Sequence, residues 1–207
     1  MRYRGDTETD MGVRVRRATK DDRDLVVRLL DAAFHDDPVS CWILPGEEHR
    51  RRVHPVLMAT FVDLVQEHGW VDLAEDSTAV ALWLPTPAGK PDPDDGPARL
   101  REAVDPDNER VELIGALTAA HHPHHAAHLY LWMIAVDPQR QGEGLGSALM
   151  APVLERCDRE GKAAYLEASS ARSRELYRRL GFADHGEPLH LPYGGPAMYP
   201  MWREPQS

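Results

Sequence analysis

The chain has 207 residues, 42% of them hydrophobic, and a formal net charge of -10 at pH 7. This length and apolar content fit one ordinary domain with a single core, and the acidic balance, without a basic stretch interleaved with aromatics, argues against nucleic acid as a partner. Its two cysteines exclude a disulfide framework and a zinc knuckle, and no signal segment or run of 18 apolar residues occurs, so we expect a soluble, cytoplasmic protein without membrane contact.

Strand and helix patterns alternate along most of the chain. Residues 1–12 show neither pattern and are expected to form a flexible arm before one domain at 13–207. Thr19 occupies an N-cap position, Asp37-Pro38 interrupts a helical pattern, and Pro55 marks either a true helix start or a kink. The expected elements are strand 13–17, a helix after Thr19 to Phe34, helix 47–68, strands 70–74 and 78–84, a proline-rich surface connection at 85–97, helices 99–104 and 108–120, strand 128–136, a helix opening near 145, strand 163–168, helix 172–180, and strands 182–187 and 197–203. This order predicts the α/β class with a mixed sheet.

A glycine-dense turn from Gln141 to Gly146 stands between a strand pattern and an apolar helical pattern. Its glycines remove Cβ atoms, so that backbone N–H groups at a helix start can converge on an anion. A Walker loop requires Gly-Lys-Ser/Thr, whereas Gly146 is followed by Ser147 and alanine. The spacing also misses the dinucleotide pattern G-x-G-x-x-G, although Glu167 lies about 20 residues downstream. The turn is therefore another kind of phosphate loop or only a tight strand-to-helix connection.

Two motifs of this chain resemble motifs of the GNAT N-acetyltransferases and occur in the same order as in that family. Gln141 to Gly146 has the form Q-x-x-G-x-G of that family's acyl-CoA pyrophosphate loop, and Leu166 to Phe182 pairs a strand L-E-A with a helix carrying L-Y-x-x-L-G-F. Together with V-R-R-A-T-K-D-D at Val15 to Asp22, they look like puromycin N-acetyltransferase and related small-molecule acetyltransferases. The resemblance implies the GNAT fold, with six to seven strands. Strands four and five, at 128–136 and 163–168, would be parallel and splay apart around acetyl-CoA, the co-substrate.

The resemblance also implies which residues bind the cofactor. Backbone at the end of the fourth strand would hold pantetheine and the acetyl carbonyl, and the glycine turn would hold the pyrophosphate at the helix N-terminus. The expected cofactor-binding residues are Ile134, Ala135, Val136, Gln141, Gly142, Glu143, Gly144, Leu145, Gly146, Ser147 and Ser173. Glu143 departs from many relatives, and we expect it to point outward with Arg140 offsetting its charge. Ser173 replaces an asparagine common in relatives. Arg172 and Arg174 either contact the 3'-phosphate or form a solvated helix face.

Acetyl transfer to an amine needs a proton acceptor for the amine and a proton donor for the leaving thiolate. Tyr177 is the expected general acid, since a tyrosine hydroxyl stays protonated at neutral pH; the alternative is core packing beside Phe182. Glu167 on the splayed strand is the expected second catalytic residue, although the base is not fixed by sequence. Other candidates for the base are Asp36, Asp37, Glu47, His121, His122, His124 and His125. The histidine run H-H-P-H-H lacks metal-ligand spacing, and no metal is expected.

The connection after the first helix often lines the acceptor pocket in this family. Phe34, Asp37 and Trp42 are therefore the expected substrate-binding residues, with plain packing as the alternative for Trp42. We expect acetyl transfer to a primary amine of a small molecule by direct attack in a ternary complex, by a monomer or homodimer. The alternatives are a protein or peptide N-acetyltransferase, which would need an open groove, and a non-catalytic CoA-binding regulatory module, against which the presence of Tyr177 speaks.

Overall fold

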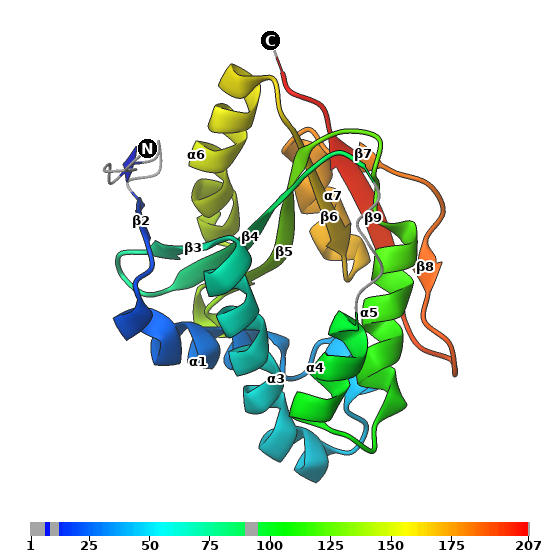
Figure 1. Cartoon of the computed structure of the whole chain (residues 1–207). Coiled ribbons are helices and arrows are strands. Elements are labelled where there is room, and N and C mark those ends of the chain that lie inside the picture. Colours follow the sequence, from blue (N-terminus) through cyan, green and yellow to red (C-terminus); the bar gives the residue numbers. More distant parts are fainter. Residues whose placement is uncertain (1–6, 9–12, 90–94, 207) are drawn as a thin grey trace.

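A mixed sheet forms the centre of the computed structural model, which describes residues 7–8, 13–89 and 95–206 (Figure 1). Within these residues the sheet has nine strands in the order β1-β2-β3-β4-β5-β6-β9-β7, with β8 paired to β9. The strands are β1 (Thr7–Glu8), β2 (Arg14–Arg17), β3 (Trp70–Ala74), β4 (Ala79–Thr86), β5 (His128–Val136), β6 (Ala163–Ala168), β7 (Ala183–Asp184), β8 (Leu189–His190) and β9 (Ala197–Arg203). The β5–β6 pair is parallel, and all the others are antiparallel.

Helices cover both faces of this sheet. They are α1 (Arg23–Phe34), α2 (Pro38–Ile43), α3 (Glu47–His68), α4 (Gly96–Val104), α5 (Glu109–His121), α6 (Leu145–Glu160) and α7 (Ala171–Arg179), with short 3-10 turns η1 (Lys20–Asp22) and η2 (Pro138–Arg140). Alternation along β4 shows the two layers. Ala79, Ala81 and Trp83 pack in the core with α6 and α7, whereas Val80 and Leu82 pack in the core with α1 to α5. Because both faces are buried, β4 reads as a continuous apolar run.

The α/β class and the mixed sheet are confirmed, and the elements differ from the expected ones in detail. The sheet has nine strands rather than six to seven, because it also contains the short strands β1 and β8. Each has only two residues, which is too short for an alternating pattern to be recognised in the sequence. β1 lies inside the expected arm, whose other residues, like residues 90–94 of the expected surface connection, are outside the described chain. Asp37-Pro38 ends one helix and also begins α2, with the Asp37 carboxylate accepting a hydrogen bond from the Val39 amide at 2.8 Å. α3 begins at Glu47 and runs through Pro55.

The parallel strands β5 and β6 separate after a short pairing. Their register joins His128 to Ala163, Leu129 to Ala164 and Tyr130 to Tyr165, after which the two strands continue without pairing each other. On its other side, β5 carries a bulge: Leu82 pairs with Met133 and Trp83 with Leu131, so that Trp132 is an extra residue. The expected splay is therefore present. None of the helices in the described ranges has the length and apolar character needed to span a bilayer.

Candidate active site

A cavity of about 720 Å³ lies where β5 and β6 separate, a size typical of small-ligand sites. Its walls come from the second half of β5, the end of β6, the glycine turn, α7, and α1, α2, α3 and α5. The cavity therefore brings together the glycine turn and the connection after α1, which are about 100 residues apart in the sequence. Of the residues expected to bind ligands or act in catalysis, those that line it are Phe34, Asp37, Ile134, Ala135, Val136, Gln141, Gly142, Gly144, Leu145, Gly146, Ser147, Glu167, Ser173 and Tyr177.

The glycine turn has the backbone conformations that its composition suggests. Gly142 and Gly144 have φ values of 91° and 81°, in the left-handed region that side chains with a Cβ rarely adopt. Gly144 is the N-cap of α6, so the free amides and positive dipole end of that helix lie at the cavity wall. Gly146 has an ordinary conformation, and a Cβ there would lie 3.8 Å from the Val136 side chain. Neither backbone conformation nor packing therefore requires glycine at position 146. We attribute this third glycine to the space that an approaching ligand needs.

Glu143 points away from the cavity, as expected. Its carboxylate accepts a hydrogen bond from Arg140 Nε at 2.6 Å, and it does not line the cavity although its neighbours in the turn do. A second acidic residue, Asp76, lies 3.7 Å from the same guanidinium. The carboxylate of Glu143 is therefore paired with Arg140 and does not lie in the wall where an anion would bind.

One face of α7 supplies positive charge to the cavity. Arg172 and Arg179, seven residues apart and thus on one side of the helix, both line it, and neither forms an ion pair with another described residue. Arg174, one of the two arginines considered from the sequence, instead bonds Asp184 at 2.7 Å. The Ser173 side chain takes part in the α7 capping box, where its hydroxyl and the Ser170 amide are 3.2 Å apart. The spacing of seven residues from Arg172 is the sequence signal that identifies Arg179 as the second arginine of this face.

Tyr177 lies in the cavity wall close to the end of α7. Its side chain is buried, and its ring meets the Phe182 ring in an edge-to-face contact with centroids 6.0 Å apart. Within the described residues the hydroxyl makes no hydrogen bond, and burial raises the pKa of Tyr177 above its usual value. The residue is thus both packed and protonated, and its O–H is available to a ligand.

Glu167 is the most strongly perturbed carboxyl group of the cavity wall. The Tyr130 hydroxyl donates to its Oε2 at 2.7 Å, while its Oε1 is buried and has no hydrogen bond of regular geometry among the described residues. The Tyr165 hydroxyl also acts on this carboxyl group and lowers its pKa. Burial raises the pKa of Glu167 to about 7, against the opposing effect of the neighbouring tyrosine hydroxyls. Glu167 therefore combines a place in the cavity wall with a pKa close to neutral pH, as a general base requires.

The opposite side of the cavity is mainly apolar. Asp37 is a half-buried acidic group on this side: the Ser169 hydroxyl donates to Asp37 Oδ2 at 3.1 Å, and partial burial raises the pKa of Asp37. Phe61 and Trp132 form an aromatic wall, with ring centroids 4.7 Å apart. The remaining lining on this side consists largely of Ala33, Phe34, Val39, Ile43, Leu57, Met58, Leu100 and Ile114.

Trp42 does not take the place expected for it. It is buried, does not line the cavity, and donates from Nε1 to the Pro192 carbonyl oxygen at 2.8 Å. Arg110 lies over its ring at 5.3 Å. Trp42 therefore supports a surface loop, and Trp132 supplies the aromatic wall, since the bulge in β5 shifts its position relative to regular strand alternation.

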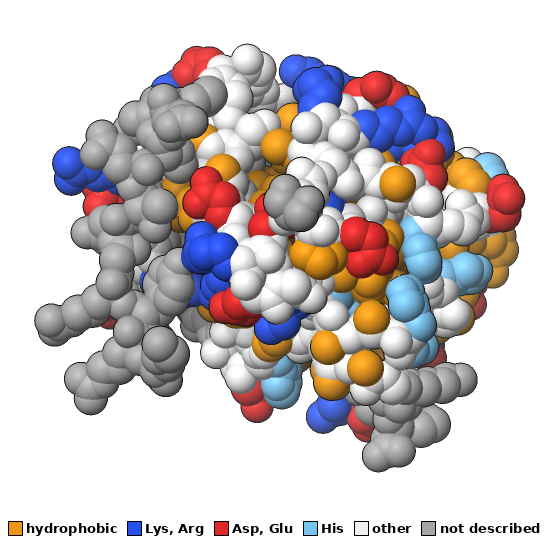
Figure 2. Space-filling model, turned by 90° about the horizontal axis from the view of Figure 1, so that it is seen from above, with side chains coloured by type: hydrophobic (Ala, Val, Ile, Leu, Met, Phe, Trp, Pro, Cys, Tyr) orange, Lys and Arg blue, Asp and Glu red, His pale blue; other side chains and the backbone are white. Residues whose placement is uncertain are grey.

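The histidines considered as bases lie outside the cavity. His122 Nε2 and His128 Nε2 are 2.9 Å apart, in a cluster with Tyr130 and Tyr165, and burial lowers the pKa of His122 to about 4. Figure 2 shows histidine side chains gathered at one side of the face seen from above. Glu47 pairs with Arg51 instead of facing the cavity. Of the candidates for the base, Glu167, Asp36 and Asp37 remain.

Comparison with known proteins gives consistent matches. The model of the acetyltransferase (GNAT) family matches residues 70–182. Over 178 residues the chain is 28% identical to an uncharacterised N-acetyltransferase of Schizosaccharomyces pombe, covering 79% of this chain and 71% of that protein. Over 77 residues it is 32% identical to L-2,4-diaminobutyric acid acetyltransferase of Virgibacillus pantothenticus, covering 36% of this chain and about half, 48%, of that enzyme. A Corynebacterium glutamicum crystal structure, described as a histone acetyltransferase and related acetyltransferase, shares 28% identity and a TM-score of 0.71 over 93% of this chain and 96% of that one.

Proposed function

The chain belongs to the acetyltransferase (GNAT) family and is an acyl-CoA-dependent N-acetyltransferase; on that premise we propose that it transfers an acetyl group from acetyl-CoA to a primary amine of a small molecule. The observation that carries this proposal is that one cavity wall holds both the Glu167 carboxyl group and the Tyr177 hydroxyl, which has no hydrogen bond among the described residues. A proton acceptor and a proton donor in one cavity are what amine acetylation requires. The narrower likeness to puromycin N-acetyltransferase remains part of the proposal.

The distribution of charge along the cavity supports binding of the cofactor at one end and of the amine at the other. The α6 N-terminus, Arg172 and Arg179 are positive and suit the diphosphate and 3'-phosphate of the cofactor. Asp37 and Glu167 are acidic and suit an ammonium group. The backbone edges of β5 and β6 that do not pair with each other lie between these ends, where pantetheine and the acetyl carbonyl would bind.

The proposed chemistry needs no covalent enzyme intermediate. The Glu167 carboxylate accepts a proton from the amine, and the amine nitrogen forms a bond to the acetyl carbon as the bond from that carbon to sulfur breaks. Tyr177 donates its hydroxyl proton to the leaving sulfur and later regains one from solvent, to which Glu167 releases the proton that it took from the amine. Tyr177 acts from the protonated form that burial favours, whereas Glu167, whose pKa is raised to about 7, acts from its ionised form.

The acceptor end favours an amine with an apolar body. Phe61 and Trp132 supply flat surfaces, and helices α1, α2, α3 and α5 surround this part of the cavity. That enclosure supports a small molecule over a lysine presented by a folded protein. The test is a CoA-release assay over a panel that includes puromycin, 2,4-diaminobutyrate, agmatine, arylalkylamines and a lysine peptide. We expect turnover with a small primary amine; turnover with the peptide alone, or acetyl-CoA binding without any turnover, would contradict the proposal.

Gly146→Ala should weaken cofactor binding without weakening the fold. A Cβ at this position meets nothing closer than 3.8 Å in the protein, so stability should be unchanged, but the methyl group projects where the cofactor approaches the α6 N-terminus. We expect the Kd for acetyl-CoA to rise about tenfold, which corresponds to about 1.4 kcal/mol. Calorimetric titration gives the Kd, and thermal unfolding gives the stability.

Gly161→Ala is the matched control at the other end of α6. Gly161 is the C-cap, with a left-handed φ of 62°, and a Cβ added there would have no atom of the described chain within 4 Å. This change should lower the free energy of unfolding by about 1 kcal/mol and leave the Kd for acetyl-CoA unchanged. Equal Kd values for Gly146→Ala and the unchanged protein would show that the cofactor does not approach the turn.

A further inference from the structure

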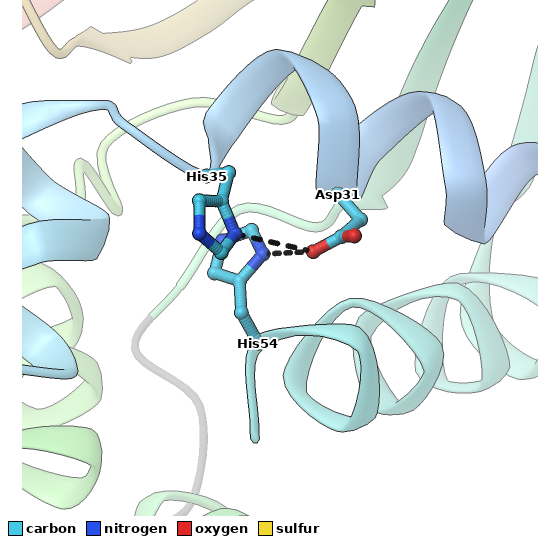
Figure 3. A group of neighbouring side chains, drawn as sticks. All are labelled: Asp31, His35 and His54. Carbon is cyan, nitrogen blue, oxygen red and sulfur yellow. Dashed lines mark hydrogen bonds and ion pairs between the residues drawn. The ribbon is translucent and has the colours of Figure 1, made fainter. Parts of the chain in front are cut away.

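A serine, a histidine and an aspartate from three successive helices form a connected chain beside the cavity. Ser40 of α2 lines the cavity, and its Oγ lies 3.1 Å from Nε2 of His54 in α3. The other ring nitrogen of His54, Nδ1, lies 2.6 Å from Oδ1 of Asp31 in α1. Figure 3 shows the His54 ring turned toward Asp31, with His35 beside it. The proposed acetyl transfer uses none of these three residues.

The direction of the hydrogen bonds follows from which atoms can donate. The Asp31 carboxylate only accepts, so His54 Nδ1 carries the proton and donates it. A neutral His54 then has a bare Nε2, which accepts from the Ser40 hydroxyl. His54 is fully buried, and burial lowers its pKa, so that it is neutral at pH 7 despite the opposing effect of Asp31. The Ser40 oxygen thus keeps its lone pairs for a ligand.

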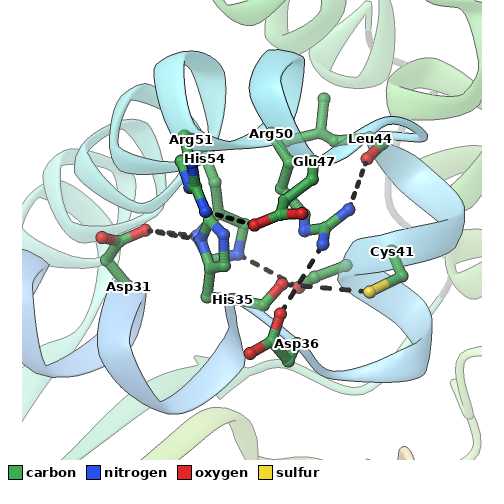
Figure 4. Close-up of polar contacts among 10 residues, drawn as sticks. Asp31, His35, Asp36, Cys41, Leu44, Glu47, Arg50, Arg51 and His54 are labelled. Carbon is green, nitrogen blue, oxygen red and sulfur yellow. Dashed lines mark hydrogen bonds and ion pairs between the residues drawn. The ribbon is translucent and has the colours of Figure 1, made fainter.

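These distances favour hydrogen bonding over a bound cation. Asp31, His35 and His54 are, within the described chain, the group of potential ligand atoms close enough to hold a metal ion. However, the 2.6 Å separation of His54 Nδ1 and Asp31 Oδ1 is a strong hydrogen bond, and two atoms bound to Zn²⁺ at about 2.0–2.1 Å in tetrahedral geometry lie farther apart. Arg50 and Cys41 bond other groups around the cluster: Arg50 contacts the Leu44 carbonyl oxygen and Asp36 (Figure 4), and Cys41 contacts the His35 carbonyl oxygen.

We propose that Ser40, His54 and Asp31 form a second catalytic centre, in which Ser40 is a nucleophile toward small activated acyl esters that enter the cavity. The three parts and both contact distances match those of a nucleophile, its base and the residue that orients the base. Ser40 is the catalytic residue that meets the substrate, and Asp31 is a positioning residue that fixes the tautomer of His54. This activity goes beyond the proposed acetyl transfer and needs neither amine nor CoA.

The reaction balances with water as the second substrate. Ser40 Oγ forms a bond to the acyl carbon, its proton moves to His54 Nε2, and the bond to the leaving alcohol breaks as the alcohol takes that proton. Water then attacks the acyl-serine and gives its proton to Nε2, and Ser40 regains the proton as the carboxylic acid leaves. The net reaction converts ester and water into acid and alcohol.

Hydrolysis should be slow because the nearest amides are already used. The Val39 amide donates to the Asp37 side chain at 2.8 Å, and the Cys41 amide to the Asp37 carbonyl oxygen at 2.9 Å. Neither amide on the two sides of Ser40 is free to stabilise an oxyanion, and loss of one such donor costs about 10²–10³ in rate. Substrates with good leaving groups, such as p-nitrophenyl acetate, are therefore the suitable probes.

The experiment labels the full chain with a fluorophosphonate, which forms a serine–phosphorus bond and releases fluoride, and locates the adduct by peptide mass spectrometry. We expect the adduct on Ser40 and not on the other cavity serines, Ser147, Ser169, Ser170 and Ser173, which have no histidine partner among the described residues. Ser40→Ala should abolish labelling and p-nitrophenyl acetate hydrolysis. Thr118→Ala is the matched control, since its hydroxyl also lines the cavity but bonds the Ile114 and Gly115 carbonyl oxygens of its own helix.

Asp31→Asn separates a catalytic from a structural role. Asp31 is partly exposed, so the amide can be accommodated, but it no longer holds His54 in the tautomer that leaves Nε2 bare. We expect the labelling rate to fall at least about tenfold while thermal stability and acetyl-CoA binding persist. No adduct on Ser40 of the unchanged protein, or equal labelling rates in folded Asp31→Asn, would overturn the proposal. If the protein acetylates an amine but takes no label, the proposed acetyl transfer is supported and the second catalytic centre is ruled out.

Discussion

Tyr177→Phe should lower kcat for acetyl transfer by about 10²-fold or more and leave the Kd for acetyl-CoA unchanged. The ring is packed against Phe182 and stays in place, so the change removes only the hydroxyl, which lies in the cavity wall without a partner among the described residues. Burial keeps this hydroxyl protonated, and its proton is the one that the leaving sulfur requires. Steady-state CoA release gives kcat, and calorimetry gives the Kd.

Tyr199→Phe is the control for this measurement. Tyr199 on β9 lies beneath the Arg174 guanidinium, 4.5 Å from it, and does not line the cavity. Loss of its hydroxyl should change neither kcat nor the Kd. If Tyr177→Phe also leaves kcat within twofold of the unchanged enzyme, Tyr177 is a packing residue and the sulfur is protonated by solvent.

The elements that the sequence predicts correctly are those in which one physical cause determines the structure. The period of apolar residues gave helix 47–68 and strands 128–136, 163–168 and 197–203 with the bounds that the structure has. The glycine turn is predictable because glycines indicate positions where the backbone takes positive φ values. The splay of β5 and β6, in contrast, came from the family resemblance, because no local pattern in either strand announces where pairing stops.

What the sequence missed depends on contacts between distant segments. Trp42 was expected at the acceptor pocket, but α2 turns it toward Pro192, 150 residues away. Trp132 reaches the cavity because of a bulge that exists only in the pairing of β5 with β4. The Ser40–His54–Asp31 chain joins three helices whose packing no periodicity predicts. Such residues become candidates only after the chain is folded.

Glu167→Gln should lower kcat by about 10²–10⁴-fold, the range attributed to a positioned general base. The amide keeps the shape of the side chain and can still accept the Tyr130 hydrogen bond, but it cannot take a proton from the amine. In the unchanged enzyme, activity should rise with pH and level off above about 7, because burial raises the pKa of Glu167 to about 7 and only its ionised form acts as a base. The residual activity of the variant should lack this transition. Glu175→Gln, an exposed carboxyl group on α7 paired with Arg178, should retain both rate and profile.

The same shift makes a stability prediction of definite sign. A carboxyl group whose folded pKa is raised stabilises the fold most below its unfolded pKa of 4.5, and this contribution is lost as pH rises through about 7. At pH 8 the buried charge should cost on the order of 3 kcal/mol. Glu167→Gln, which stays neutral, should therefore have a higher Tm than the unchanged enzyme at pH 8 and a similar one at pH 5. A variant that loses activity but keeps the transition near pH 7 would move the base to another group. Asp37, a half-buried carboxyl group of the wall whose pKa is also raised, would then be tested by the same pair of measurements.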